Sequence, residues 1–448
     1  MREVLMSRRY FGTDGVRGRV GEFPLTSDFA MRLASATAQV LDLAGQAVVI
    51  GHDTRESAPM FEAALTAGFL ASGVDVRTVG ALPTPAISHM VTTTGAALGT
   101  VISASHNPAS DNGIKFFDRT GGKLSDATEI SIENALDDPV KTLASPQLGQ
   151  LTALNDALDR YARFCAGLLP ASADISQLRV VVDCANGATA QVAPQVLGDL
   201  VKDVTAIGAT PTGANINQGC GSTAPQLLQD TVVAQNADLG IAFDGDGDRL
   251  LMVDHTGALI DGDQLLYVLA THRHAAGELR GPVVGTVMTN MGLEEALRSH
   301  GIELVRAKVG DRYVLETLAD RGGDLGGEAS GHLLMLDKTP TGDALAAAIT
   351  VLGVLATTGA SLAELAAGMP RYLQVLESVR VPAHFDLTNE PDVAAATEAA
   401  TRRLGDAGRI VLRASGTEPV IRVMVEGRDE PLVRELAAEL IASIEAVA

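Results

Sequence analysis

The sequence predicts an α/β protein made of three related α/β domains with mixed sheets and a small C-terminal α+β domain. Three observations support this. The chain has 448 residues, more than one hydrophobic core usually spans. Buried strands alternate with helices up to about residue 370, as in βα units. After that the order of elements changes. We expect domains at residues 1–160, 161–262, 263–372 and 373–448.

The first domain shows the alternation clearly. An apolar strand over Ala47–Ile50 precedes a helix over Ser57–Ala71, and a strand over Val74–Val79 precedes a helix that starts near Pro83. A second apolar run, Ala96–Ile102, also predicts a buried strand.

The same strand–loop–helix pattern occurs twice more along the chain. Arg179–Asp183 leads into a helix near Thr189–Leu197, and Pro282–Met288 leads into a helix over Leu293–Ser299, so the pattern suggests a triplicated domain. The last segment has a different order, which favours helices on one face of an antiparallel sheet. Its expected strands are 375–381, 409–413 and 420–425, and its expected helices are 391–403 and 430–446.

Composition limits the class of partner. Hydrophobic residues make up 46% of the chain and charged residues 20%, as in soluble globular proteins. The net charge, 34 − 55 = −21, argues against nucleic-acid and anionic-membrane partners. An anionic substrate would therefore need a local basic pocket. No membrane-length apolar run or signal peptide is apparent, and the three cysteines fit reduced residues of a cytoplasmic protein.

Ser105 is a candidate nucleophile because it follows a buried strand at a sharp loop. Asn107 precedes a proline, which restricts its backbone, and we expect Asn112-Gly113 to form a tight hairpin turn. Ile114–Phe117 would then run back along the strand. A lone serine in such a turn is usually structural, so the interpretation depends on residues elsewhere in the chain.

Asp244, Asp246 and Asp248 alternate on one short loop after the apolar strand Leu239–Phe243. Carboxylates at this density repel one another unless a cation lies among them, and hard oxygen ligands suit Mg²⁺, Mn²⁺ or Ca²⁺. An EF-hand is excluded because Arg249 and His255 occupy the positions that need Gly and Glu. A purely structural cation site stays open.

Four further loops carry candidate ligand groups. Gly12–Gly18 is glycine-rich and contains Arg17, although a plain turn would look the same. Glu328 and Ser330 are two residues apart, so in an extended segment both would face the hydroxyls of a sugar. Arg413–Pro419, with Arg422 nearby, combines hydroxyls, glycine and guanidinium groups suited to phosphate. Lys308–Arg312 could close on substrate or simply cap a helix.

Together these motifs resemble the α-D-phosphohexomutase family over the whole chain and in the family's order. The matching segments are FGTDGVRG at 11–18, ISASHNP at 102–108, DNGIKFF at 111–117, DGDGDR at 244–249, VGDRYV at 309–314, GEASGH at 327–332 and RASGTEP at 413–419. The resemblance implies four domains packed around a central cleft.

The resemblance also implies a phosphoserine at Ser105 that shares one Mg²⁺ with Asp244, Asp246 and Asp248. Phosphoryl transfer to a sugar phosphate would give glucosamine 1,6-bisphosphate, or glucose 1,6-bisphosphate, which turns round without leaving. The implied substrate-binding residues are Arg249, Lys308, Gly310, Asp311, Glu328, Ser330, Arg413, Ser415, Gly416, Thr417 and Arg422.

The resemblance implies that Lys115 and His332 lie near the transferring group, so the candidates for proton transfer are Lys115, His332 and His106, and Arg17 would also lie there if its loop folds over a phosphate. A lysine held against Mg²⁺ and Arg17 would have a lowered pKa, as a general acid–base needs.

Several functions remain open at this level. FGTDGVRG and GEASGH favour an amino-sugar phosphate by resemblance, while a phosphomannomutase or phosphoglucomutase would use the same chemistry. A metal-dependent sugar phosphatase and a non-catalytic sugar-phosphate sensor are the alternatives from other classes. The resemblance also implies a homodimer, as is usual among bacterial members.

Overall fold

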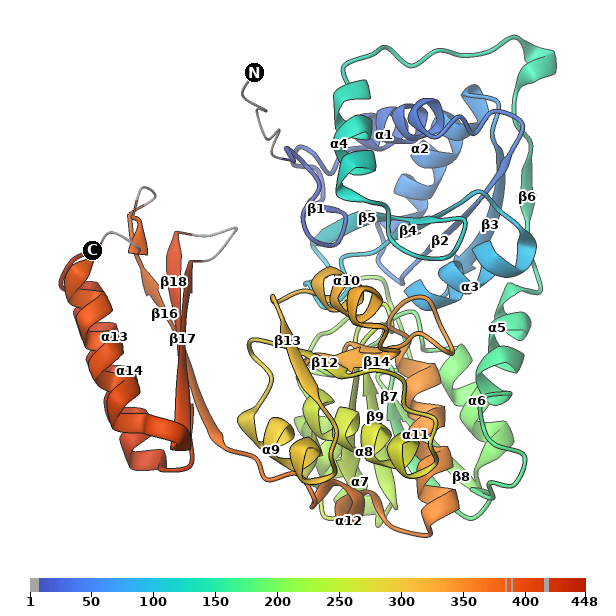
Figure 1. The fold of residues 1–448 in the computed structure, drawn as a ribbon. Coiled ribbons are helices and arrows are strands. Elements are labelled where there is room, and N and C mark those ends of the chain that lie inside the picture. Colours follow the sequence, from blue (N-terminus) through green and yellow to red (C-terminus); the bar gives the residue numbers. More distant parts are fainter. Residues whose placement is uncertain (1–7, 383–384, 388–389, 415–418) are drawn as a thin grey trace.

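Figure 1 shows the computed structural model, which describes residues 8–382, 385–387, 390–414 and 419–448. The first of four sheets in these residues has six strands. They are β1 (Val16–Arg19), β2 (Ala47–His52), β3 (Asp75–Ala81), β4 (Leu98–Ile102), β5 (Asp111–Asp118) and β6 (Leu151–Ala153), in the spatial order β1-β5-β4-β2-β3-β6. The helices of this domain are α1 (Ser27–Val40), α2 (Ala58–Ala71), α3 (Thr84–Thr94) and α4 (Asp126–Ala135).

The second and third sheets follow in the chain. The second domain contains β7 (Arg179–Asp183), β8 (Asp203–Ile207), β9 (Leu239–Phe243), β10 (Leu250–Asp254), β11 (Leu259–Ile260), α5 (Ala157–Ala166), α6 (Val192–Leu200) and α7 (Gln226–Gln235). The third contains β12 (Val283–Thr286), β13 (Leu304–Ala307), β14 (Leu325–Gly327), β15 (Leu333–Met335), α8 (Gly262–Ala275), α9 (Met291–Ser299), α10 (Asp311–Arg321), α11 (Ala344–Thr358) and α12 (Leu362–Ala366).

One four-strand arrangement is common to these three sheets. Neighbouring strands follow the orders β5-β4-β2-β3, β10-β9-β7-β8 and β15-β14-β12-β13. In each set the last three strands are parallel and the first is antiparallel to its neighbour. The predicted triplication of a mixed α/β sheet is therefore confirmed by topology, although the sequences of the three units differ.

The shared topology places three motif-bearing loops at equivalent positions. The loop between β4 and β5 carries Ser105, the loop between β9 and β10 carries Asp244, and the loop between β14 and β15 carries Glu328. Each leaves the third strand of its unit, whose residues are all buried. The sheets thus provide rigid support for residues that protrude beyond the core.

The predicted turn at Asn112-Gly113 is wrong. Both residues lie inside β5, where Gly113 pairs with Arg17 and Asn112 with Gly18 of β1. The pairing with a second strand overrides the local turn preference. Residues 103–110 make the reversal instead, with Ser105 at φ 51°.

The C-terminal domain has its own sheet and core. It consists of β16 (Leu373–Arg380), α13 (Pro391–Leu404), β17 (Gly408–Ala414), β18 (Val420–Gly427) and α14 (Glu430–Glu445). Its antiparallel strands have the order β16-β18-β17, and both helices cover one face of the sheet (Figure 1). The predicted α+β domain is confirmed. The opposite face turns toward the rest of the molecule.

The other three domains share much of their core. The largest hydrophobic cluster contains Val49 of β2, Phe243 of β9 and Leu345 of α11. Helix α11 is apolar on all sides because it packs against α5, α8, β9 and β10. Within the described residues, no helix is both long and apolar enough to cross a membrane. The three cysteines are buried and free, as predicted.

Candidate active site

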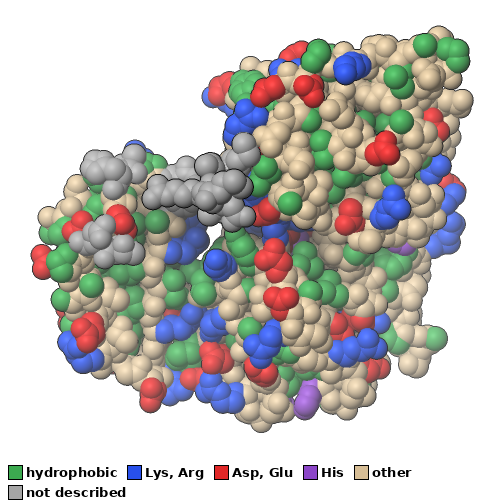
Figure 2. Space-filling view, turned by 45° about the horizontal axis from the view of Figure 1, so that its top comes forward, with side chains coloured by type: hydrophobic (Ala, Val, Ile, Leu, Met, Phe, Trp, Pro, Cys, Tyr) green, Lys and Arg blue, Asp and Glu red, His purple; other side chains and the backbone are tan. Residues whose placement is uncertain are grey.

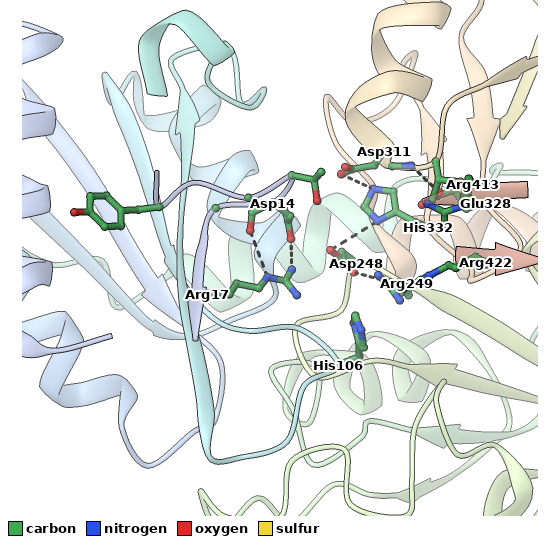
Figure 3. Close-up of a pocket in the computed structure, with 16 residues that line it drawn as sticks. Asp14, Arg17, His106, Asp248, Arg249, Asp311, Glu328, His332, Arg413 and Arg422 are labelled. Atoms are coloured by element: carbon green, nitrogen blue, oxygen red, sulfur yellow. Dashed lines mark hydrogen bonds and ion pairs between the residues drawn. The ribbon is translucent and has the colours of Figure 1, made fainter. Parts of the chain in front are cut away.

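A cavity of about 620 Å³ lies where residues of all four domains meet. In Figure 2 the C-terminal domain stands to one side, and charged side chains lie beside the hollow between it and the rest of the molecule. Figure 3 shows the lining residues from the three repeated units and from β17 and β18. The lining consists of Tyr10, Gly12, Thr13, Asp14, Gly15, Arg17, His106, Asp248, Arg249, Val309, Gly310, Asp311, Glu328, His332, Arg413 and Arg422.

Ser105 and the acidic loop, 139 positions apart in sequence, meet at the floor of this region. The Ser105 hydroxyl donates a hydrogen bond to Asp244 Oδ2 at 2.5 Å. Both residues are buried, with exposed fractions of 1% and 0%. This contact is the arrangement that phosphoryl transfer from a serine beside a metal would need.

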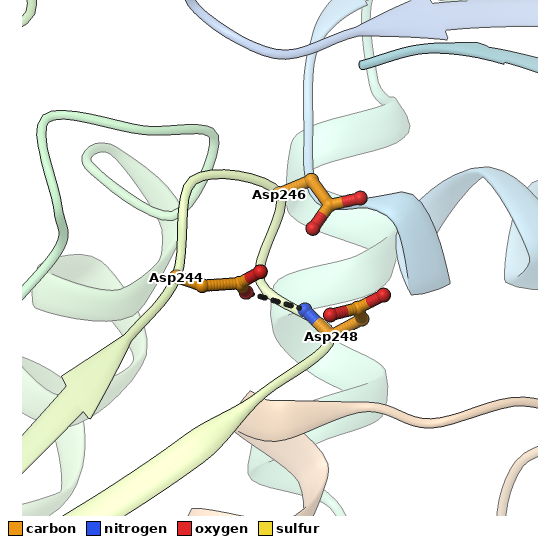
Figure 4. Close-up of side chains that lie close together, drawn as sticks. All are labelled: Asp244, Asp246 and Asp248. Atoms are coloured by element: carbon orange, nitrogen blue, oxygen red, sulfur yellow. Dashed lines mark hydrogen bonds between the residues drawn. The ribbon is translucent and has the colours of Figure 1, made fainter. Parts of the chain in front are cut away.

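The three aspartates fit a metal ion. One ligand atom from each of Asp244, Asp246 and Asp248 lies within 4.8 Å of the others (Figure 4). Asp246 Oδ1 and Asp248 Oδ1 are buried and lack a hydrogen-bond partner among the described residues. Burial, together with the charges of Asp248 and Asp246, raises the pKa of Asp244. A divalent cation would relieve this repulsion and use the unpaired oxygens.

Lys115 lies beside these carboxylates on β5. Its ammonium is 2.8 Å from both Asp14 Oδ2 and Asp246 Oδ2, and 3.8 Å from Asp248 Oδ2. Its neighbours Ile114 and Phe116 pack into the hydrophobic core, so Lys115 faces the opposite side of the strand. The predicted lowering of the Lys115 pKa is wrong for this arrangement. Burial acts to lower it, but Asp14, Asp246 and Asp248 outweigh burial and raise it.

The two candidate histidines have opposite environments. His106 Nδ1 is 3.3 Å from the Ser105 hydroxyl, and burial, with Arg249 and Arg17, lowers its pKa to about 4. Burial also acts to lower the His332 pKa, but Asp248 and Asp311 reverse this and raise it to about 9. At neutral pH, His106 is therefore uncharged and only weakly basic, whereas His332 is charged and able to donate a proton.

The phosphate-binding prediction falls on two opposed arginines and on a segment outside the described residues. Arg413 of β17 pairs directly with Arg422 of β18, and both line the cavity. Burial and Arg422 lower the pKa of Arg413. The Nε atoms of both are buried without a partner in the described part of the chain. Ser415, Gly416 and Thr417 lie outside the described residues.

Of the two predicted sugar-binding residues in the loop between β14 and β15, only one lines the cavity. Glu328 lines it and accepts a hydrogen bond from the Gly310 N–H at 3.1 Å. Ser330 is exposed and does not line the cavity. The expectation of an extended segment is wrong because Gly331 N–H bonds to the Glu328 carbonyl and forms a turn. Two side chains two residues apart in a turn no longer share a face.

The loop between β13 and α10 is similarly divided. Gly310 and Asp311 line the cavity, and Asp311 Oδ2 accepts a hydrogen bond from the Lys123 ammonium at 2.5 Å. Lys308 is exposed, lies outside the lining, and places its ammonium 5.6 Å from the centre of the Tyr313 ring. Arg249 and Arg17 both line the cavity as expected.

Sequence reasoning missed Asp14 and Lys123. Asp14 pairs with Arg17 and accepts hydrogen bonds from Lys115 and Lys123. Burial opposes ionisation, but these cations lower the Asp14 pKa well below its usual value. Asp14 could have been identified from the sequence because it is the acidic residue of the glycine-rich loop. No local pattern marks Lys123.

Comparison with known proteins agrees with the fold. Successive segments match four phosphoglucomutase/phosphomannomutase domain descriptions: alpha/beta/alpha domain I at residues 8–141, domain II at 159–257, domain III at 261–372 and the C-terminal domain at 376–443. The chain belongs to this family. The four matched segments correspond to the three repeated units and the C-terminal domain.

Curated relatives are similar over nearly the full length. A phosphoglucosamine mutase of Methylobacillus flagellatus is 52% identical, covering 98% of this chain and 99% of the relative. That of Halorhodospira halophila is 54% identical, covering 98% and 97%. A solved phosphoglucomutase/phosphomannomutase family protein of Burkholderia thailandensis has a TM-score of 0.80 at 24% identity, covering 97% of each chain. This last likeness shows the fold.

Proposed function

We propose that this enzyme is an isomerase that interconverts glucosamine 6-phosphate and glucosamine 1-phosphate through a phosphoserine at Ser105. The observation that carries the proposal is the 2.5 Å hydrogen bond between Ser105 and Asp244, buried next to a cavity whose other side is lined by Arg413 and Arg422. The substrate comes from the names of relatives that are 52% and 54% identical over nearly the whole chain. The chemistry comes from the geometry.

The metal would be held by Asp244, Asp246, Asp248 and a phosphate on Ser105, and Mg²⁺ fits because every donor is a hard oxygen. When bound, it supplies charge neutralisation for the phosphoryl group. A related N-acetylphosphoglucosamine mutase of Aspergillus fumigatus, with a TM-score of 0.68 at 17% identity, was solved with GlcNAc-6P and magnesium.

In the forward direction a sugar hydroxyl attacks the phosphorus on Ser105. The bond from phosphorus to the sugar oxygen forms, the bond to Ser105 Oγ breaks, and the hydroxyl proton moves to a basic side chain. His106, with a pKa of about 4, is uncharged and free of a proton on one ring nitrogen, although it is a weak base, and His332 is charged and able to return a proton. The product of this step is glucosamine 1,6-bisphosphate.

Return of the second phosphate to Ser105 requires the bisphosphate to turn round in the cavity. Arg413 and Arg422 would hold the phosphate that is not reacting in either orientation. Glu328 would hold ring hydroxyls, and Arg17 and Arg249 would face the transferring phosphate. A serine-to-alanine variant of the Aspergillus fumigatus enzyme was solved with glucose 1,6-bisphosphate, which supports such an intermediate in this fold. The homodimer, the cytoplasmic location and the domain boundaries stay predictions.

Steady-state turnover of glucosamine 6-phosphate, glucose 6-phosphate and mannose 6-phosphate tests the substrate. We expect glucosamine 6-phosphate to have the highest kcat/KM. Equal or higher values for the neutral sugars would make the enzyme a phosphoglucomutase or phosphomannomutase. Release of free phosphate faster than isomer formation would make it a phosphatase.

Intact-protein mass spectrometry tests the phosphoserine. We expect one phosphate on the active enzyme, lost in Ser105→Ala, with mutase activity reduced at least about 10³-fold. The control is Ser110→Ala, which removes an exposed hydroxyl from the same loop and should keep both the phosphate and the activity. An active Ser105→Ala enzyme would refute the mechanism.

A further inference from the structure

The Arg55 guanidinium is buried behind the loop that carries Ser105. Its side chain has an exposed fraction of 0%, and its Nε donates to Asp53 Oδ2 at 2.9 Å. The terminal nitrogens donate to main-chain carbonyls along the loop. These belong to Ser105 at 3.0 Å, Asn107 at 2.8 Å, Asp111 at 2.9 Å and Pro108. One planar side chain therefore ties the start of the loop to its end.

Ser105 needs such support because its backbone is strained. Its φ of 51° lies in the left-handed region, which side-chain-bearing L-residues rarely adopt. The Ser105 N–H donates to the Ser103 hydroxyl at 2.9 Å, and that hydroxyl donates to Asp53 Oδ2 at 2.6 Å. Asp53 thus connects Arg55 and Ser103, and these two residues hold the peptide groups on either side of the Ser105 Cα, Ser103 at its N–H and Arg55 at its carbonyl.

A residue of the second domain donates hydrogen bonds to two of the same carbonyls. Asn217 Nδ2, from the segment between β8 and α7, donates to the Ser105 carbonyl at 2.9 Å and to the Asn107 carbonyl at 3.1 Å. Gly245 of the acidic loop packs on the same point. A Cβ built on Gly245 would lie 2.5 Å from the Ser105 carbonyl oxygen and 2.8 Å from Asn217 Nδ2. The Ser105 carbonyl is therefore enclosed by both domains.

We propose that Asn217 and Arg55 are positioning residues that lock the Ser105 main chain against the acidic loop, with Asn217 joining the two domains. The proposal rests on the proposed function, since it concerns the placement of the serine that carries the phosphoryl group. The Ser105 Oγ–Asp244 contact depends on where the Ser105 backbone lies. Neither residue lines the cavity, so sugar binding does not depend on them directly.

This arrangement predicts a specific kinetic signature. Without the Asn217 amide the Ser105 carbonyl loses a donor, and the loop moves relative to Asp244. Transfer then slows while the groups that bind the sugar phosphate stay in place. We expect kcat to fall about 10-fold in Asn217→Ala, with KM changed less than 2-fold.

Asn217→Asp is the sharper variant because it preserves side-chain size. It replaces the donor with an oxygen that faces two carbonyl oxygens, so kcat should fall further than in Asn217→Ala, by about 100-fold. A role limited to packing predicts nearly normal kcat for Asn217→Asp. The matched control is Asn215→Ala, which removes two hydrogen bonds made to Thr210 and Thr212 of its own segment. Its kcat should stay within 3-fold of the original.

Hydrogen exchange of the peptide covering residues 103–111, followed by mass spectrometry, gives a readout independent of mutase activity. The loop amides should exchange at least 10-fold faster in Asn217→Asp and in Arg55→Lys, whose single ammonium cannot reach all four carbonyls. Unchanged exchange and unchanged kcat in Asn217→Asp would overturn the proposal. Failure of the proposed function would appear separately, as absence of mutase activity in the unsubstituted protein, while the exchange comparison would still test the contact.

Discussion

The two ends of the cavity differ in how completely their polar groups are paired. At the transfer end, Ser105 contacts Asp244, Lys115 contacts Asp14 and Asp246, and the surrounding core is shared between domains. At the distal end, Arg413 and Arg422 face each other on a domain that has a separate core, and their Nε atoms have no hydrogen-bond partner in the part of the chain that the structure describes.

This contrast teaches which part of the site is assembled before substrate arrives. Two like charges on directly opposed strand residues are unfavourable without an anion. The opposed placement of the two arginines therefore becomes favourable only when a phosphate binds. At the transfer end, by contrast, the side chains already contact one another without substrate. Substitutions at the two ends should accordingly affect different kinetic constants.

Among the substitutions that compare the two ends, Asp246→Asn at the transfer end should have the largest effect. It removes a carboxylate that faces the expected cation, so kcat should fall at least about 10²-fold and the Mg²⁺ concentration for half-maximal activity should rise. Both are measured by steady-state assays with Mg²⁺ restored after chelation. Asp254→Asn, a buried carboxylate at the end of β10, is the control and should leave the Mg²⁺ dependence unchanged. Normal Mg²⁺ dependence in Asp246→Asn would show that the cation lies elsewhere.

Arg422→Ala tests the distal end and should change KM instead. Loss of one charge-assisted contact to phosphate costs about 1.5–3 kcal/mol, which corresponds to a roughly 10- to 150-fold increase in KM. Because the like charge opposite Arg413 disappears, the thermal unfolding temperature should not fall. Arg402→Ala removes an exposed charge from α13 of the same domain and should leave KM unchanged. A drop in kcat alone would mean that the two ends are not separable.

The last prediction concerns the connection between the third domain and the C-terminal domain, where we expect a change in stability and none in the kinetic constants. Asp263 accepts a hydrogen bond from the Asn290 N–H at 2.7 Å, and Asn290 in turn bonds to Tyr372 just before β16. Burial and Asp261 raise the pKa of Asp263 to about 7. Between about pH 4 and pH 7 the folded state therefore binds more protons than the unfolded state, and the free energy of unfolding falls as pH rises through this range.

Asp263→Asn should remove this dependence. The free energy of unfolding of the variant, minus that of the original protein, should be roughly 2–4 kcal/mol larger at pH 8 than at pH 5. Urea unfolding of both proteins at both pH values measures this difference. Asp230→Asn, on exposed α7, should show the original pH dependence. A pH profile that is identical in Asp263→Asn and in the original would contradict the raised pKa.

The sequence predicted features that depend on local pattern or on motif identity. The strand Leu239–Phe243, the triplicated units and the C-terminal α+β domain follow from hydrophobic periodicity, and they appear as expected. The Ser105 and Asp244 contact followed from family motifs. The Asn112-Gly113 turn failed because β1 pairs with those residues, which no local pattern reveals.

Other misses have the same origin in long-range contacts. Lys123 gains its role only because Asp311, 188 positions away, lies 2.5 Å from it. The raised pKa of Lys115 depends on Asp14 and Asp246 from different loops. Asn217 sits in a polar segment whose composition is that of an ordinary surface loop. Sequence therefore identifies the residues that carry chemistry more readily than those that hold them in place.

The equivalent position of the three loops has a consequence for how such an enzyme can change. Each loop begins and ends on neighbouring strands of its own unit, so extra residues inserted there would leave the ladder of that sheet intact. An insertion would instead alter the distance across the shared cavity. Variation in loop length could thus change which sugar the cavity accepts, in one unit at a time, while the three sheets keep their structure.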